Sequence, residues 1–208
     1  MFITFEGIDY SGKTTQVGLL KKYYENLGKE VLLIREPGGT RISEKIRDLL
    51  LDKKNYAMTE KAELLLFAAA RAQLVNEVIN PALERGVIVI SDRFHHSSIA
   101  YQGYGRKLDL DFVNNLQYFA ISDTKPDITF YIHIPIEEVT KRKQANSRGD
   151  DDRIESSKSE FYHDVIDGYL KLVNSDNSMK LIDGVKRIND IHEQIINYIK
   201  GFSPVNEV

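Results

Sequence analysis

The stretch Gly7-Ile8-Asp9-Tyr10-Ser11-Gly12-Lys13-Thr14 decides the fold. Its two glycines are separated by four residues and followed by Lys and Thr, which is the spacing of a P-loop. Residues 1–5 before it predict a short buried strand, and residues 15–27 after it predict an amphipathic helix that ends at Gly28. A glycine turn between a strand and a helix directs backbone N–H groups and the positive end of the helix at one place. The sequence therefore predicts that this turn binds a polyphosphate.

The residue types of the turn fit a bound nucleotide and its metal ion. Lys13 is expected to reach the β- and γ-phosphates, and the hydroxyl of Thr14 is expected to hold Mg²⁺. The alternative is a turn that only closes a corner between strand and helix, and the Lys-Thr pair at the required offset argues against it. The predicted ATP site consists of Gly7, Ile8, Asp9, Tyr10, Ser11, Gly12, Lys13, Thr14 and Thr15.

The composition predicts one soluble domain over residues 1–208. Hydrophobic residues at 42% and charged residues at 28% are typical of a chain that buries a core, so disorder is not indicated. The net charge of −3 argues against general nucleic-acid binding. The absence of cysteine excludes thiol catalysis, disulfides and cysteine-based zinc sites, and it fits a reducing compartment. Because no apolar run reaches membrane-spanning length and the first strand leaves no room for a signal peptide, we expect a cytoplasmic protein without a membrane partner.

Strands and helices alternate along the whole chain. Four strand-like segments follow the first one, at residues 30–34, 87–90, 128–134 and 179–182. Helical patterns separate them, the longest of which runs from residue 60 to residue 79 and restarts at Pro81. Strands that alternate with helices form a parallel sheet covered on both faces. The predicted fold is therefore α/β, a five-stranded parallel sheet of the P-loop NTPase type with helices on both faces.

An acidic residue and an arginine follow the apolar strand at residues 87–90. Asp92 is placed to contact Mg²⁺, either directly or through another ligand of the metal. Arg93 adds a cation beside the phosphate site, which suits an anionic acceptor; the alternative for Arg93 is a salt bridge at the rim. Acids at strand ends are common, but their combination with a P-loop favours the functional interpretation.

A polar and charge-dense stretch covers residues 144–159. It carries Arg148 and Arg153 on either side of a glycine and three aspartates, between two predicted helices. A solvated loop is the usual interpretation of such a run. Its position in a phosphate-binding domain favours a lid, because arginines on a lid can close over a transferring phosphoryl group, neutralise its charge and exclude water.

Two further segments, residues 67–71 and 97–102, carry aromatic and polar side chains that suit a pocket for a flat heterocycle. Phe67 and Arg71 are four residues apart, so they share one side of a predicted helix. A ring and a guanidinium can sandwich and hydrogen-bond a heterocycle, although an ordinary core position is the better interpretation of Phe67 alone. Arg71 lies in so apolar a stretch that it needs an anion or an acceptor as partner.

The histidines His95 and His96 are predicted to be exposed loop residues.

Eight segments then occur in an order that covers nearly the whole chain: Phe5-Glu6-Gly7, Gly12-Lys13-Thr14-Thr15, Arg35-Glu36-Pro37-Gly38-Gly39-Thr40, Phe67-Ala68-Ala69-Ala70-Arg71, Asp92-Arg93, Ser97-Ser98, Ala100-Tyr101-Gln102-Gly103 and Asp152-Arg153-Ile154-Glu155. Together they resemble the bacterial thymidylate kinases, which are P-loop nucleoside monophosphate kinases. The Glu-Pro-Gly-Gly-Thr and Ala-Tyr-Gln-Gly segments are far more specific than the P-loop alone.

The resemblance implies transfer of the γ-phosphoryl group of ATP to dTMP with Mg²⁺ at Thr14 and Asp92, which yields dTDP and ADP. Phe67 would stack on thymine, Arg71 would bond a thymine carbonyl, and Tyr101 would lie against the sugar where a 2′-hydroxyl would clash. Ser98 and Gln102 would lie at the base, and Arg35 and Arg93 would hold the acceptor phosphate. The implied dTMP site consists of Arg35, Pro37, Phe67, Arg71, Arg93, Ser98, Tyr101 and Gln102.

The resemblance also implies the catalytic residues, which are Lys13, Arg93, Arg148, Arg153 and Asp9. Asp9 would meet the 3′-hydroxyl or an arginine bound to it. Tyr10 occupies the P-loop position at which part of the family carries its catalytic arginine, so that arginine is expected in the lid. Members of the family are typically homodimers. Two alternatives stay open, namely a kinase for another nucleoside monophosphate and an ATP-binding regulatory module without acceptor turnover.

Overall fold

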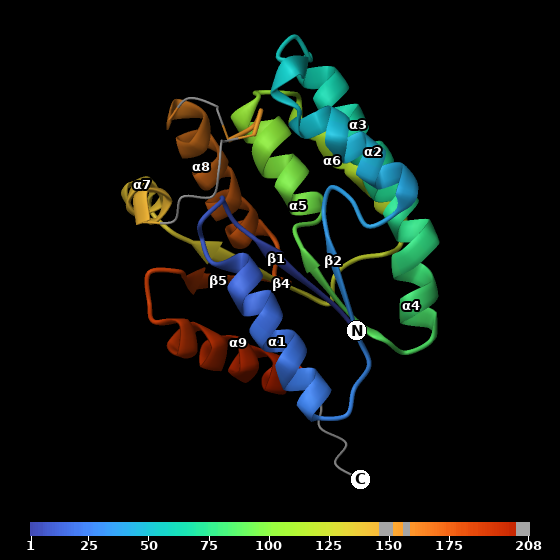
Figure 1. Ribbon diagram of the computed structural model, residues 1–208, viewed down its shortest axis with the longest axis vertical. Coiled ribbons are helices and arrows are strands. Elements are labelled where there is room, and N and C mark those ends of the chain that lie inside the picture. The colour runs from blue at the N-terminus through green and yellow to red at the C-terminus, as the bar shows by residue number, and fades with distance from the viewer. Residues whose placement is uncertain (146–151, 156–158, 203–208) are drawn as a thin grey trace.

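Five parallel strands form one sheet in the order β2-β3-β1-β4-β5. The computed structural model describes residues 1–145, 152–155 and 159–202. The strands are β1 (Phe2–Glu6), β2 (Val31–Arg35), β3 (Ile88–Asp92), β4 (Ile128–His133) and β5 (Met179–Asp183). The predicted α/β fold with a parallel sheet is confirmed, and β1 lies between β3 and β4 (Figure 1).

Helices connect the strands and lie on both faces of the sheet (Figure 1). Thr40 and Thr59 begin α2 and α3, because their side chains accept hydrogen bonds from the backbone N–H groups of Ser43 and Ala62. The described helices are α1 (Lys13–Asn26), α2 (Arg41–Leu51), η1 (Lys53–Asn55), α3 (Glu60–Leu74), η2 (Val75–Ile79), α4 (Asn80–Glu84), α5 (His95–Ser98), η3 (Ile99–Gly105), α6 (Leu110–Ile121), α7 (Ile136–Ala145), α8 (Ser159–Ser175) and α9 (Ile188–Phe202). None of them is long and apolar enough to cross a membrane.

The alternation of side chains along β1 divides the core into two layers. Ile3 and Phe5 are buried in a cluster with α1 and α9, whereas Phe2 is buried on the other face with η2 and α4. A further cluster lies under α8, where the rings of Tyr131 and Tyr169 stack with their centroids 4.7 Å apart. The sheet is therefore covered on both faces, as a parallel sheet requires.

The carboxyl ends of three adjacent strands meet at one edge of the sheet, and two of them carry residues of the predicted site. Arg35 ends β2 and Asp92 ends β3, and the two residues are paired in the register of the sheet. Glu6 ends β1 and is fully buried. Its carboxylate accepts hydrogen bonds from the backbone N–H groups of Phe94 and Ser97, so it ties β1 to α5. This edge of the sheet is therefore the place where the predicted residues meet.

The segment that follows β3 differs from the prediction. Residues 95–105 form α5 and the π-helical η3, and the side chains of His95 and His96 are only 6% and 3% exposed. Their rings are in contact at a tilt of 38°, with centroids 3.9 Å apart, and His96 Nε2 lies 3.0 Å from a carboxylate oxygen of Asp176. The prediction of exposed loop histidines is therefore wrong. The partner of His96 is 80 residues away in the sequence, which local pattern does not reveal.

Candidate active site

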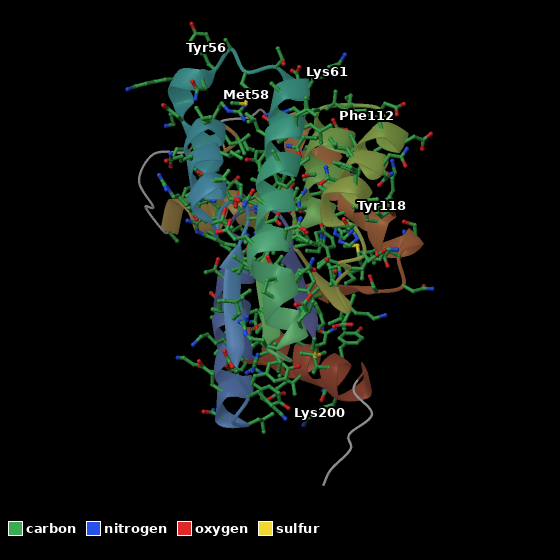
Figure 2. The ribbon with its side chains drawn as sticks, turned by 90° about the vertical axis from the view of Figure 1, so that its right-hand side faces the viewer. Tyr56, Met58, Lys61, Phe112, Tyr118 and Lys200 are labelled. Atoms are coloured by element: carbon green, nitrogen blue, oxygen red, sulfur yellow. The ribbon has the colours of Figure 1, made fainter. Side chains whose placement is uncertain are left out.

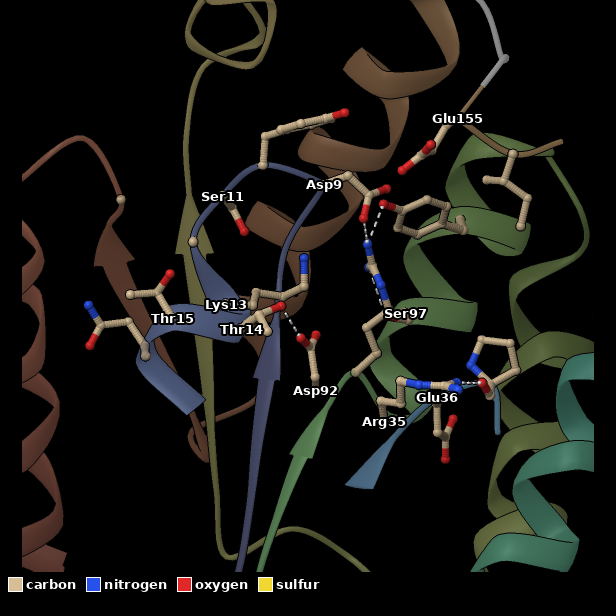
Figure 3. Close-up of a pocket in the computed structure, with 18 of the residues that line it drawn as sticks. Asp9, Ser11, Lys13, Thr14, Thr15, Arg35, Glu36, Asp92, Ser97 and Glu155 are labelled. Atoms are coloured by element: carbon tan, nitrogen blue, oxygen red, sulfur yellow. Dashed lines mark hydrogen bonds and ion pairs between the residues drawn. The ribbon is translucent and has the colours of Figure 1, made fainter. Parts of the chain in front are cut away.

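A cavity of about 610 Å³ opens at the carboxyl edge of the sheet (Figure 3). One wall is formed by residues 9–16, and the opposite wall is formed by residues of β2, α3, α5 and η3. This volume is in the range of small-molecule sites. Gly7 and Ile8 belong to the turn without lining the cavity. The predicted residues that line it are Asp9, Tyr10, Ser11, Gly12, Lys13, Thr14, Thr15, Arg35, Pro37, Phe67, Arg71, Asp92, Arg93, Ser98, Tyr101 and Gln102.

Backbone geometry explains the glycine spacing of the turn. Gly7 has a φ of +140°, and a Cβ atom there would lie 2.6 Å from the carbonyl oxygen of Ile132 on β4. Gly12 has a φ of +98°, and Tyr10 between them is also in the left-handed region at +64°. Only glycine adopts such angles without steric cost. A turn of this kind presents successive backbone N–H groups to an anion, which agrees with the predicted phosphate site.

Lys13 is a buried cation in the wall of the cavity. Its Nζ donates a hydrogen bond of 2.9 Å to the carbonyl oxygen of Ile8. Burial and the nearby Arg93 lower the pKa of Lys13 to about 8, while Asp92 and Asp9 oppose that shift. A phosphate beside Nζ would favour the ammonium form, because an opposite charge at close range raises the pKa of a lysine.

Thr14 and Asp92 form the predicted metal pair (Figure 3). The Thr14 hydroxyl donates a hydrogen bond of 2.8 Å to Oδ2 of Asp92. Hydroxyl and carboxylate oxygens are hard ligands that suit Mg²⁺, and Mg²⁺ commonly completes its octahedron with water and substrate phosphates. The two residues therefore fit a magnesium ion that binds together with a nucleotide.

Arg93 is held at the cavity by its backbone and by Asp9. Its φ of +74° lies in a region that non-glycine residues rarely adopt, a kind of strain found mostly at functional sites. Nη2 donates to Oδ1 of Asp9 at 2.8 Å and to the Tyr101 hydroxyl at 3.3 Å, and Nη1 donates to the Gly7 carbonyl at 2.8 Å. Burial alone would raise the pKa of Asp9, but Arg93 and Lys13 bring it below its ordinary value. Asp9 thus forms an ion pair with Arg93, and the contact with the 3′-hydroxyl or an arginine bound to it stays a prediction.

Arg71 is fully buried, and each of its N–H groups has an acceptor in the protein. Nε and Nη2 lie 2.7 Å and 2.5 Å from Oε2 of Glu36. Nη1 donates to Oγ of Ser98 at 2.9 Å and to Oε1 of Gln117, and Nη2 donates to the Phe94 carbonyl at 3.1 Å. Burial raises the pKa of Glu36, and the Arg71 guanidinium opposes that shift. The expected partner of Arg71 is therefore Glu36, and a base carbonyl would have to replace one of these acceptors.

Phe67 and Arg35, which are predicted to bind the second substrate, lie on the same wall as Arg71. Phe67 packs against the apolar cluster under α8 and also lines the cavity, so it is both a core and a cavity residue. Arg35 donates from Nη1 to the Pro37 carbonyl at 2.9 Å and from Nη2 to Oε2 of Glu44 at 3.0 Å. The guanidinium of Arg35 is thereby oriented along the wall.

Two arginines in the wall, Arg142 and Arg47, are not predicted from the sequence. Arg142 of α7 donates to the carbonyl oxygens of Tyr10 at 3.1 Å and Gly184 at 2.7 Å. Arg47 of α2 donates to the Pro37 carbonyl at 2.9 Å. Both lie on helices that begin near the carboxyl end of a strand, and that position is the signal that points to them.

Of the two predicted lid arginines, the structure describes only Arg153. Arg148 lies outside the described residues. Arg153 does not line the cavity: its Nη2 lies 2.7 Å from Oε2 of Glu63, and its Nε donates to the Leu50 carbonyl at 2.7 Å. A catalytic role for either arginine stays a prediction.

The lowered pKa of Lys13 predicts a pH dependence of triphosphate binding. If only the ammonium form binds, the affinity for Mg-ATP falls about tenfold from pH 7 to pH 9, because a pKa of about 8 is crossed. Calorimetric titration of the protein at pH 7, 8 and 9 measures this fall. Lys13→Arg is the matched control, since a guanidinium keeps its proton over this range and its weaker binding is expected to be independent of pH. An equal fall in both proteins would contradict the assignment.

Comparison with known proteins agrees with this geometry. The sequence profile of the family "Thymidylate kinase" matches residues 5–195. The thymidylate kinase of Thermosipho melanesiensis is 49% identical over 195 residues, which are 94% of this chain and 95% of that protein. The thymidylate kinase of Fervidobacterium nodosum is 46% identical over 202 residues, which are 97% of this chain and 100% of that protein. The crystal structure of the thymidylate kinase from Ehrlichia chaffeensis has a TM-score of 0.77 at 36% identity and covers 96% of this chain and 98% of its own. The chain therefore belongs to the thymidylate kinase family.

Proposed function

We propose that this protein transfers the γ-phosphoryl group of ATP to dTMP, giving dTDP and ADP, as a step of nucleotide biosynthesis that supplies dTTP. The observation that carries the proposal is that a P-loop and a wall rich in arginine line one cavity. A module that only binds ATP needs no second wall of this kind. Family membership further favours dTMP over another nucleoside monophosphate as the acceptor.

The donor half of the reaction is assigned to residues 7–15. Lys13 contacts the β- and γ-phosphates, and Thr14, backed by Asp92, provides the protein ligand for Mg²⁺. When bound, Mg²⁺ would be held by Thr14 with Asp92 behind it and would neutralise charge that develops on the phosphate oxygens. The hydrogen bond from Thr14 to Asp92 orients the hydroxyl before the nucleotide arrives, which lowers the entropy that binding costs.

The acceptor half is assigned to the opposite wall. Phe67 stacks on the thymine, and Arg71, fixed by Glu36, presents its guanidinium to the base with Ser98 and Gln102 close by. Tyr101 lies against the sugar. The acceptor phosphate is held by Arg35 and Arg93, with Pro37 beside them.

Catalysis in this assignment is positioning and charge stabilisation. In-line phosphoryl transfer needs little covalent help from the protein, and an acceptor phosphate is already anionic, so no strong general base is required. Lys13 and Arg93 stand on either side of the group in transfer, and Asp9 fixes Arg93. Arg148 remains the arginine proposed to close over the transferring group, since Arg153 would first have to leave Glu63.

The surface suggests a homodimer, and we propose one that acts in the cytoplasm without a nucleic-acid partner. The α3 and α6 helices pack side by side and expose large apolar side chains (Figure 2). Leu65 of α3 is 52% exposed, and Phe112 and Phe119 of α6 are 56% and 82% exposed. An exposed apolar group of this size typically marks an association surface. We therefore assign the face of α3 and α6 to contact with a second copy.

The acceptor assignment predicts a strong preference for dTMP. ADP release with Mg-ATP is measured against dTMP, dUMP, UMP, dCMP, dGMP and dAMP. Arg71→Lys keeps a cation for Glu36 but cannot reach Ser98, Gln117 and Phe94 together. We expect kcat/KM for dTMP to fall by about a hundredfold, the order of two hydrogen bonds to a charged group, with the KM for ATP nearly unchanged.

Arg85→Lys is the control for this variant, because Arg85 is exposed at the end of α4 and remote from the cavity. It should behave as the unmodified protein. Equal turnover of another monophosphate would overturn the choice of dTMP. Full dTMP turnover by Arg71→Lys would overturn the role of Arg71.

The dimer assignment predicts that a charge on the α6 face separates the copies. Phe119→Asp should sediment as a monomer, because its carboxylate would be buried against apolar groups of the partner at a cost of several kcal/mol. Sedimentation velocity measures the mass of the particle. Leu27→Asp is the control, since Leu27 is 56% exposed at the end of α1, away from α3 and α6. A monomeric unmodified protein, or a dimeric Phe119→Asp, would contradict the assignment.

A further inference from the structure

Glu63 is a buried carboxylate just behind the wall of the cavity. It lies in the first turns of α3 and is 1% exposed, and it does not line the cavity itself. Three side chains from separate segments bind it. They are Gln102 of η3, Arg106 directly after η3, and Arg153 of the short segment 152–155.

The contacts use both oxygens of the carboxylate. Oε1 accepts from Nε2 of Gln102 at 2.9 Å and from Nε of Arg106 at 3.2 Å. Oε2 accepts from Nη2 of Arg106 at 3.2 Å and lies 2.7 Å from Nη2 of Arg153. Since three hydrogen bonds and the ion pair with Arg153 converge on one carboxylate, Glu63 fixes the relative position of the three segments that supply these partners.

The segment 152–155 is a closed turn that directs three of its residues to the cavity and one away from it. Oδ1 of Asp152 accepts from the backbone N–H groups of Ile154 and Glu155, both at 2.8 Å. Asp152, Ile154 and Glu155 line the cavity, whereas Arg153 is directed to Glu63. Arg153 also binds the chain end of α2, with its backbone N–H on the Leu51 carbonyl at 3.2 Å.

Gln102 connects the same carboxylate to the acceptor wall. It is 1% exposed, it lines the cavity, and it follows Tyr101 in η3. Glu63 therefore holds two parts of the cavity wall at once, the turn 152–155 through Arg153 and the acceptor helix through Gln102. A charged group buried in this way contributes little net stability, because its desolvation offsets the attraction, so stability alone does not account for it.

We propose that Glu63 is a positioning residue for the acceptor: through Arg153 it holds the turn 152–155 against the cavity, and through Gln102 it sets the acceptor wall beside that turn. Arg153 is in this assignment the anchor of the turn and not a group that touches the transferring phosphoryl. The inference rests on the proposed function only in naming dTMP as the acceptor, because the contacts are independent of the ligand.

Glu63→Gln tests the proposal. The amide has the same shape but only one acceptor oxygen, so it cannot bind both arginines. We expect the KM for dTMP to rise about tenfold or more, which is the effect of losing one hydrogen bond to a charged group. The KM for ATP should stay within about twofold, because only the acceptor site is disturbed. We also expect hydrogen–deuterium exchange to accelerate at the amides of residues 153–155 and to stay unchanged in the sheet.

Matched variants separate positioning from stability. Glu60→Gln lies one helical turn earlier and is exposed, so it should change neither the KM for dTMP nor the exchange at residues 153–155. Arg153→Gln should reproduce both effects of Glu63→Gln, and its effect on exchange should be at least as large, because it also removes the Nε bond to the Leu50 carbonyl. The double variant should show less than the sum of the two single effects, because each single variant already breaks the ion pair between the two residues. If Glu63→Gln fails to fold, Arg153→Gln alone tests the proposal.

Two results would overturn the proposal. One is an unchanged KM for dTMP in Arg153→Gln and Glu63→Gln; the other is faster exchange throughout the protein, which would indicate a purely structural role. Failure of the proposed function itself is distinguishable, because the unmodified protein would then not turn over dTMP while exchange at residues 153–155 would still respond to both variants.

Discussion

The buried carboxylate of Glu6 fixes the geometry on which the rest of the site depends. Its Oε1 accepts from the backbone N–H groups of Phe94 and Ser97 at 2.9 Å and 3.2 Å, and its Oε2 accepts from the hydroxyls of Ser97 and Tyr169 at 2.5 Å and 2.8 Å. A buried charge is tolerated only when hydrogen bonds replace its lost hydration, and these four donors meet that requirement. Because the bonded segment directly follows Arg93, Glu6 sets where the chain leaves β3 and thereby where Arg93 meets the cavity.

Charge in the site is arranged as fixed pairs. Arg93 is bound to Asp9 and Arg71 to Glu36. Donors held in place before the substrate arrives need no reorganisation during reaction, which is the main source of electrostatic catalysis in phosphoryl transfer. Arg35, Arg71 and Arg93 have little freedom in the cavity, because each guanidinium is bound by an acid from another part of the fold, namely Glu44, Glu36 and Asp9.

The fold and the donor wall could be predicted from sequence because their signals are local. The spacing from Gly7 to Thr14 and the alternation of strands and helices each depend on neighbouring residues, and the sheet follows from them. The partners of Arg71 and Arg153 could not be predicted, because Glu36 and Glu63 are 35 and 90 residues away from them and no periodicity links the pairs. The burial of His96 was missed for the same reason.

The central claim is that donor and acceptor occupy one cavity together, so that the phosphoryl group passes directly between them. Initial-velocity measurements that vary ATP at several fixed concentrations of dTMP test this claim most directly. Direct transfer in a ternary complex predicts double-reciprocal lines that intersect. Parallel lines would contradict the account, because they indicate a covalent phosphoenzyme that forms before the acceptor binds.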